Sequence, residues 1–243
     1  MNETARPAFY ALAPGGWRDY VTLLHPPYTA WHLSYVVIGA AIAPHWRPGI
    51  LGLALLAFFL GMGVGAHALD ELNGRPLQTR IGETTLGALA VVSLAAAAAI
   101  GVVTAIDTSL WLLVFVATGA FIAVVYNLEL FGGRFHSGVW FALAWGALPV
   151  LATFYAATRG LRVEAVAAAV FATLLSYVQR VLSTPVRMVR RRVRAVSGRI
   201  DLADGTELPV TRETVAGEPE RALRLLSAAT VALAVALVLV RVT

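Results

Sequence analysis

The sequence contains no cysteine, no lysine and few charged side chains. Charged residues make up 14% of the 243 residues, while 58% are hydrophobic; a soluble domain carries roughly 25% charged residues. Without cysteine the chain can form neither disulfides nor thiolate metal sites. A chain this apolar cannot cover itself with polar surface. The composition therefore excludes a typical soluble domain and predicts that lipid solvates much of the protein.

Seven segments are apolar over about the length that crosses a bilayer, which is roughly 20 residues. We therefore predict an all-α, polytopic transmembrane helical bundle of about seven spans. The N-terminus has no continuous apolar stretch, so we expect the first span, and no cleaved leader, to direct insertion. The predicted spans are Tyr28–Pro44, Ile50–Leu69, Thr85–Ile106, Ser109–Leu128, Ser137–Ala157, Val163–Leu182 and Leu223–Val242.

The arginines predict how the chain is oriented. All nineteen basic residues are arginines, and with the N-terminus inside only Arg47, Arg159, Arg162 and Arg241 face outward. The other fifteen face the cytoplasm, whereas the reverse orientation would translocate the run of residues 190–192. Cytoplasmic loops carry the excess of basic residues in membrane proteins. We predict a multi-pass protein of the cell membrane with its N-terminus cytoplasmic and its C-terminus outside.

Three parts follow along the chain. Residues 1–182 are predicted to form the bundle, residues 183–221 a basic cytoplasmic loop, and residues 222–243 the last transmembrane helix. Residues 199–210 alternate around an Asp-Gly pair, which predicts a short β-hairpin. Arginines at helical spacing indicate that the sixth span continues into this loop as a basic amphipathic helix. Pro219 is expected in the first turn of the last helix.

A polar cluster at the end of the second span is the strongest candidate for a functional site. His67, Asp70 and Glu71 stand at positions i, i+3 and i+4, so one helix face is expected to present all three. Two carboxylates and an imidazole suit a hard divalent cation such as Mg²⁺ or Mn²⁺. The alternative is a polar helix end wetted by headgroups, with a carboxylate paired to Arg75. The loop that follows contains Asn73, Arg75 and Arg80.

Two stretches at the ends of predicted spans combine polar with aromatic or basic residues. HALDELNGRPL stands at the cytoplasmic end of the second span, and YNLELFGGRFHSGVWFALAWGALPVL begins at the end of the fourth. Over about residues 20–151 the chain thereby resembles the UbiA superfamily of intramembrane prenyltransferases. The first stretch stands where the family has its first Asp-rich motif, followed by an Arg-Pro-Leu segment. In the second, the residues that match the family's tyrosine and basic cluster and its Trp-Gly-x-x-Pro-like segment are Tyr126, Arg134, Trp145, Gly146 and Pro149.

The resemblance implies transfer of a prenyl group from a polyprenyl diphosphate to a hydrophobic acceptor, with Mg²⁺ as cofactor. Asp70 and Glu71 would be the catalytic and metal-binding carboxylates, with His67 as a further metal ligand. Membrane lipids and an isoprenoid diphosphate would be the partners. Substrate contacts would come from Asn73, Arg75, Arg80, Tyr126, Arg134, Arg180 and Arg187.

The chain departs from the family where a second Asp-rich motif is expected, after the sixth span. That stretch has no carboxylate, and the nearest ones are Asp201 and Asp204. Arg180 and Arg187 stand close to the missing motif, and arginine binds phosphate bidentately. One expectation is therefore a one-metal diphosphate site assisted by arginine. The alternative is a non-catalytic protein of the same fold that binds an isoprenoid, another lipid or a protein partner.

Other functional classes receive less support. The arginine run beside the sixth span attracts anionic headgroups. It lacks the interleaved aromatic residues of a nucleic-acid surface, so we expect no nucleic acid as partner. A transporter would carry ionisable residues inside its spans, and these spans hold almost none. Among the remaining histidines, only His136 is kept as a further site candidate.

Overall fold

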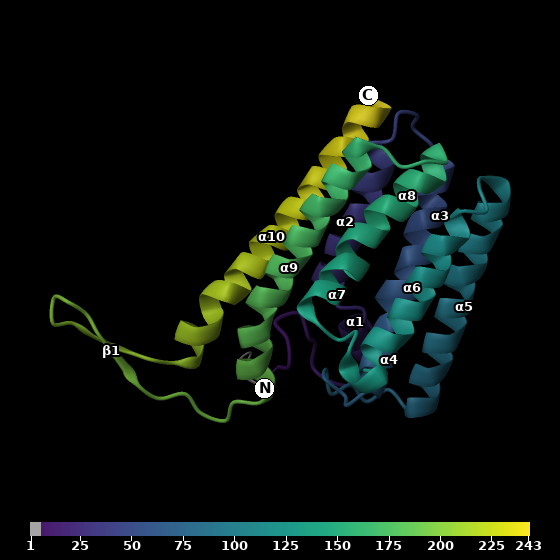
Figure 1. Cartoon of the computed structure of the whole chain (residues 1–243). Helices are drawn as coiled ribbons and strands as arrows, with labels where there is room; N and C mark the ends of the chain where they lie inside the picture. The colour runs from purple at the N-terminus through teal and green to yellow at the C-terminus, as the bar shows by residue number, and fades with distance from the viewer. Residues whose placement is uncertain (1–5) are drawn as a thin grey trace.

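The structure, a computed structural model, describes residues 6–243. Residues 1–5, where the sequence predicts no leader peptide, lie outside the described part. The described chain is all-helical apart from one small hairpin (Figure 1). Its helices are α1 (Trp17–Leu23), α2 (Pro26–Ala41), α3 (Pro48–Phe58), α4 (His67–Leu72), α5 (Glu83–Asp107), α6 (Leu112–Asn127), α7 (Gly138–Ala142), α8 (Leu148–Thr158), α9 (Val163–Arg191) and α10 (Arg212–Val242).

Two long helical units contain π-helical segments. The segment η2 (Phe59–Ala66) joins α3 to α4, and η4 (Leu143–Ala147) joins α7 to α8. A 3₁₀ turn, η3 (Phe131–Gly133), follows α6. π-Helical turns are rare and are found frequently at functional sites. Both lie beside the site described below.

All seven predicted spans are helical, and five of these helices or units are long and apolar enough to cross a membrane. α6 is apolar but only 16 residues long, and α2 also has 16 residues. By length and composition the five are typical of a membrane protein. They cover Pro48–Leu72, Glu83–Asp107, Gly138–Thr158, Val163–Arg191 and Arg212–Val242.

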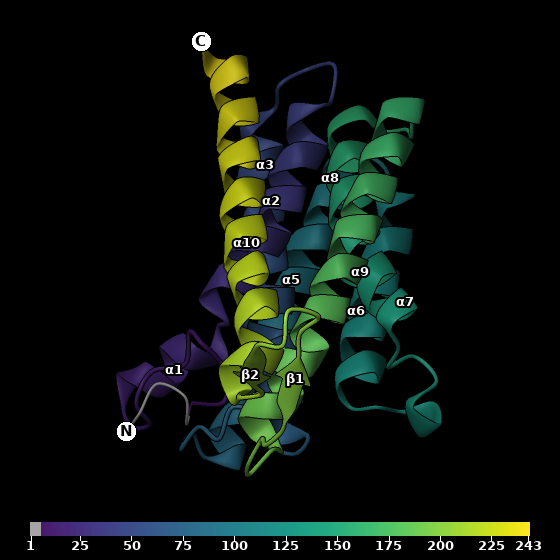
Figure 2. The same ribbon diagram turned by 90° about the vertical axis from the view of Figure 1, so that its left-hand side faces the viewer.

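The short helix α2 lies at the centre of the bundle. It contacts α3, α8, α9 and α10, and Figure 2 shows α10 running along its side. Trp31 and Tyr35 of α2 are fully buried, with Val150 of α8 and Leu223 of α10 in the same core. Glycine lets α2 approach α8 closely, since a Cβ at Gly39 would lie 2.5 Å from a backbone oxygen of α8. Small residues permit such packing in lipid.

The outer surface of the bundle is apolar. Val91 and Val92 of α5 are 68% and 67% exposed, and Val240 of α10 is 74% exposed. Soluble proteins rarely expose apolar surface on this scale. The exposed side chains therefore agree with the five long helices in indicating a surface that faces lipid.

The predicted hairpin is confirmed. Strand β1 (Arg199–Asp201) pairs antiparallel with β2 (Glu207–Pro209), and Ile200 lies opposite Leu208. The hairpin projects from one end of the bundle, which is called the hairpin end below (Figure 1). The C-terminus lies at the opposite end.

The non-helical part of the predicted basic loop is shorter than expected. α9 continues to Arg191, as predicted, but α10 already begins at Arg212. The expectation that Pro219 lies in its first turn is therefore wrong: this proline lies inside the helix. Thr211 explains the early start, because its hydroxyl accepts the backbone N–H of Thr214 and completes a capping box. A capped N-terminus outweighs the preference of proline for the first turn.

Candidate functional site

A polar cavity lies at the hairpin end of the bundle, among segments that are far apart in the sequence. Residues from the N-terminal segment (residues 6–12), α2, α4, α6, η4 and α9 form its wall. It brings together five of the predicted site residues, namely His67, Asp70, Tyr126, Arg180 and Arg187. The sequence had placed them at the ends of three different helices, and the fold makes them one site.

Two oppositely charged side chains face this cavity without partners. Asp70 and Arg187 are both half-buried, and neither side chain makes a hydrogen bond or ion pair with any described residue. Arg180 contacts His136 at 3.4 Å and lies over the Phe141 ring. Arg191 and Arg187 attract the Asp70 carboxylate electrostatically, but partial burial of charges without direct hydrogen bonds is costly unless a ligand or metal supplies them. Their placement in one cavity indicates a binding site.

Three buried polar atoms in the cavity wall also lack a partner within residues 6–243. They are His25 Nε2, His32 Nδ1 and Tyr126 Oη. His32 uses its other nitrogen to contact Gln179 Oε1 at 3.0 Å. Most buried polar groups in proteins are hydrogen-bonded. Several unpartnered atoms around one cavity therefore point to a polar ligand that would bond to them.

His25 belongs to a contact chain that reaches back to the N-terminal segment. Tyr10 Oη lies 2.7 Å from His25 Nδ1, and the His25 ring stacks on His67 with centroids 4.1 Å apart. Burial lowers the pKa of His25 well below its usual range and raises the pKa of Tyr10 well above its usual value. Both side chains are therefore uncharged at neutral pH.

Glu71, next to Asp70, serves a different purpose from the one predicted. Its side chain does not line the cavity. Oε2 accepts the backbone N–H of Leu77 at 2.9 Å, and Oε1 accepts both the N–H and the hydroxyl of Thr79. The residue is fully buried. Both oxygens are thus occupied in anchoring the loop after α4, so the expectation of one shared face holds for His67 and Asp70 and not for Glu71.

Four further predicted residues lie outside the cavity. Arg75 donates to the carbonyls of Thr79 and Ile81 within its own loop. Asn73 is exposed and donates to the carbonyl of Asn127. The side chains of Arg80 and Arg134 are exposed. The structure therefore separates these four side chains from the cluster around Asp70.

The carboxylates near the cavity are too few for a metal site made by the protein alone. In the part of the chain that the structure describes, no group of three or more His, Asp or Glu side chains is arranged to hold a metal ion. Among residues 6–243, Asp70 is the one carboxylate in the cavity wall. Asp201 and Asp204 are exposed in the projecting hairpin (Figure 1). Mg²⁺ is nevertheless held in many sites by one or two carboxylates together with substrate phosphates, which is a set that Asp70 fits.

The N-terminal segment was missed by the sequence analysis. Pro7 and Tyr10 form part of the cavity wall. Arg191 donates to the carbonyl of Pro7 at 3.3 Å, and the guanidinium of Arg224 lies 4.7 Å from the centroid of the Phe9 ring. These contacts join residues about 180 to 220 positions apart, and no local sequence pattern predicts contacts over such a separation. The sequence analysis included Arg191 only as one member of the basic run at residues 190–192 and did not predict its place at the cavity.

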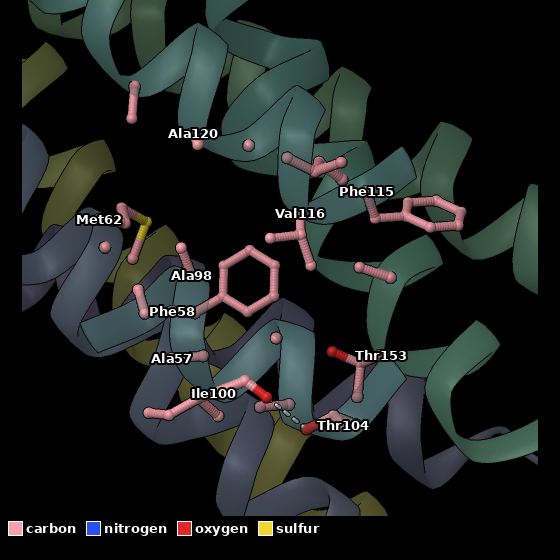
Figure 3. Close-up of a pocket in the computed structure, with 18 of the residues that line it drawn as sticks. Ala57, Phe58, Met62, Ala98, Ile100, Thr104, Phe115, Val116, Ala120 and Thr153 are labelled. Atoms are coloured by element: carbon pink, nitrogen blue, oxygen red, sulfur yellow. Dashed lines mark hydrogen bonds between the residues drawn. The ribbon is translucent and has the colours of Figure 1, made fainter. Parts of the chain in front are cut away.

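An apolar chamber adjoins the polar cavity. It is lined mainly by aliphatic and aromatic side chains of α3, η2, α5, α6, η4 and α8 (Figure 3). Trp145 of η4 lines both spaces. Its ring packs against Tyr126 with centroids 5.0 Å apart, beside Met62 and Ala66 of η2. The two π-helical segments thus meet where the polar and apolar spaces adjoin, and the pair suits a ligand with a charged head and an apolar body.

Comparisons with protein-family models, with curated proteins and with solved structures were made for the whole chain. None of the three finds a match to it.

Proposed function

We propose that this protein binds a polyprenyl diphosphate and transfers its prenyl group to a hydrophobic acceptor. The observation that carries the proposal is the pair of unpartnered charges, Asp70 and Arg187, in a polar cavity that adjoins an apolar chamber. A diphosphate would occupy the polar space, and its hydrocarbon chain would follow Trp145 into apolar surroundings. The resemblance to the UbiA superfamily supports the same ligand class.

The proposed arrangement in the membrane follows from the arginines. The hairpin end carries the basic end of α9, including Arg190 and Arg191. Basic loops remain on the cytoplasmic side. We propose seven passes through the cell membrane, with the hairpin end in the cytoplasm and the C-terminus outside. The polar cavity would then take its diphosphate from the cytoplasmic side.

Three charged residues of the cavity wall have proposed tasks in binding the diphosphate. Arg187 and Arg180 would bind phosphate oxygens, for which the planar guanidinium is well suited. Asp70 would hold Mg²⁺ together with the phosphates, and His67 lies beside it in the same wall. When bound, the cation would neutralise charge on the diphosphate and make it a better leaving group.

The chemical step would break the bond between the allylic carbon and the diphosphate oxygen. Negative charge that develops on the diphosphate would be stabilised by Arg180 and Arg187, because fixed cations in a water-poor site are strongly stabilising. Positive charge on the allylic carbon would face the rings of Tyr126 and Trp145, whose faces attract cations. The acceptor would then supply the electron pair for the new bond and release a proton.

One observation favours a second candidate, which is binding without turnover. Both oxygens of Glu71 are already occupied, so a single carboxylate remains in the cavity. If that is too little to activate the leaving group, the protein would bind an isoprenoid diphosphate and leave it intact. Incubation of purified protein with labelled polyprenyl diphosphate, Mg²⁺ and a membrane lipid extract as the source of acceptors separates the two. Label that appears in a diphosphate-free lipid, together with released diphosphate above the Asp70→Asn background, supports transfer, and unchanged bound ligand supports binding alone.

The binding claim is tested with two arginines at the same end of α9. Arg187 lines the cavity, whereas Arg192 at the helix end is exposed and does not. Binding of a polyprenyl diphosphate to protein in nanodiscs should weaken in Arg187→Gln and stay unchanged in Arg192→Gln. Equal weakening in both variants would mean that only general positive charge matters, and it would contradict a specific cavity.

A further inference from the structure

The apolar chamber contains one polar atom that its surroundings leave unsatisfied. Thr153 of α8 is 1% exposed, and its Oγ1 has no hydrogen-bond partner among residues 6–243. Figure 3 shows this oxygen directed into the chamber. The chamber has a volume of about 150 Å³ and no charged residue in its lining. A buried hydroxyl in such a place is energetically costly, because it has lost its hydrogen bonds to water and has no hydrogen bond to the protein in their place.

Other threonines of the bundle show that this is not the usual state. Thr104, which also lines the chamber, donates to the carbonyl of Ile100 at 2.8 Å. Thr158 and Thr173 likewise donate to the carbonyl four residues earlier. A threonine hydroxyl within a helix commonly donates to the carbonyl four residues earlier when no other acceptor is near. Thr153 instead points its hydroxyl into the chamber.

We propose that the chamber binds a neutral, lipid-soluble molecule with a carbonyl oxygen, and that Thr153 donates a hydrogen bond to this oxygen. The Thr153 hydroxyl has neither an acceptor for its proton nor a donor to its oxygen among residues 6–243, and a carbonyl oxygen would accept the proton without bringing an unsatisfied donor of its own into the chamber. The ligand must be uncharged, because none of the described residues that line the chamber could balance a charge. The subsite lies in the chamber that would also receive the prenyl chain, and it goes beyond the proposed diphosphate site because it involves none of the charged residues of the polar cavity.

The position of Thr153 sets the depth of the carbonyl. Thr153 lies eight positions after Trp145 along one helical unit, which corresponds to about 12 Å at 1.5 Å per residue. Trp145 marks the border with the polar cavity. The carbonyl would therefore lie about 12 Å from that border by the same rise, at the end of the chamber remote from the hairpin.

The test compares two ligands of equal length and shape, a long-chain methyl ketone and the terminal alkene in which CH₂ replaces the carbonyl oxygen. Apparent affinity is taken from the rise in unfolding temperature with ligand concentration, because a ligand that binds only the native state stabilises it. The wild type should bind the ketone about tenfold more tightly, the factor that corresponds to roughly 1.4 kcal/mol. Equal binding of both would overturn the proposal and leave a space that any lipid chain can fill.

Matched variants locate the preference. Thr153→Val should abolish it, Thr153→Ser should keep it, and Thr104→Val should keep it because that hydroxyl is already satisfied within its helix. Without ligand, Thr153→Val should unfold at a higher temperature than the wild type. A ketone preference that survives in Thr153→Val would overturn the assignment, and Thr153→Ser gives a second readout should the valine variant fail to fold. Asp70→Asn should keep the preference, so failure here is distinguishable from failure of the diphosphate proposal.

Discussion

The two sides of α4 use adjacent carboxylates in opposite ways. On the loop side, Glu71 is fully buried and accepts three hydrogen bonds from Leu77 and Thr79. On the cavity side, Asp70 has no partner among the described residues and faces Arg187 and Arg180 across a polar space. A satisfied buried carboxylate stabilises the fold, whereas an unsatisfied one marks a place where a ligand is expected. Sequence proximity alone would give both the same role.

The largest expected effect is on the loop side. Glu71→Ala should leave the N–H groups of Leu77 and Thr79 without acceptors and lower the free energy of unfolding by about 3 kcal/mol or more. Unfolding in detergent measures this. Glu83→Ala is the matched control, because the Glu83 side chain is 83% exposed and its one ion pair, with Arg75, is long at 3.8 Å. An exposed pair of this kind contributes little, so the substitution should change stability by no more than about 0.5 kcal/mol. Equal effects would contradict the anchoring role of Glu71.

On the cavity side the largest expected effect concerns Arg187. Arg187→Gln should weaken diphosphate binding by about 1.5–3 kcal/mol, the range for hydrogen bonds to charged groups. Stability should not fall, because the side chain makes no hydrogen bond or ion pair with any of residues 6–243 that the substitution would remove. Titration of the ligand and thermal unfolding of the same variant measure both quantities. Loss of stability without loss of binding would show that Arg187 supports the fold instead of the site.

Asp70→Asn should affect ligand binding and leave stability nearly unchanged, unlike substitution of its neighbour Glu71. Its free energy of unfolding should stay within about 0.5 kcal/mol of the wild type, as for substitutions that break no contact. Its Mg²⁺-dependent diphosphate binding should weaken about tenfold, or roughly 1.4 kcal/mol. Glu71 variants are expected to show the reverse, with a large loss of stability and no direct effect on Mg²⁺-dependent binding. If Asp70→Asn destabilised the protein as strongly as Glu71→Ala, the two carboxylates would share one structural role.

The smallest expected effect is on stability, and it concerns the part of the cavity wall that the N-terminal segment forms. Tyr10→Phe removes the hydrogen bond to His25 and should cost about 1 kcal/mol of stability. Tyr20→Phe is the control, since Tyr20 is 46% exposed. Thermal unfolding of the two variants measures the difference. Equal stability of Tyr10→Phe and Tyr20→Phe would mean that the N-terminal segment does not hold the cavity wall.

Local patterns in the sequence predicted most of the fold. The seven apolar segments are helical, and the Asp-Gly pair lies in the turn of the hairpin. Hydrophobic runs and turn residues act over short distances, so one sequence suffices to find them. The start of α10 was missed because Pro219 was given more weight than Thr211, whose cap acts at the true helix start.

The site was only partly predictable. Helix ends brought Asp70, Tyr126, Arg180 and Arg187 together as expected, because span boundaries fix which end each residue occupies. Spacing of i and i+4 could not show that Glu71 turns to the loop, since that depends on where the following backbone N–H groups lie. Likewise, contacts of the N-terminal segment with α9 and α10 arise from tertiary packing. Long-range pairing of this kind leaves no periodic signal in the chain.

The most direct measurement is the affinity for a polyprenyl diphosphate with and without Mg²⁺, in the wild type and in Asp70→Asn. If Asp70 holds the cation against the phosphates, Mg²⁺ should strengthen binding to the wild type about tenfold, or roughly 1.4 kcal/mol. It should have little effect on Asp70→Asn, whose Mg²⁺-free affinity should equal or exceed that of the wild type, because the carboxylate that repels the diphosphate in the absence of Mg²⁺ is gone. Equal stimulation of both proteins by Mg²⁺, or no binding to either, would contradict a diphosphate site built on Asp70.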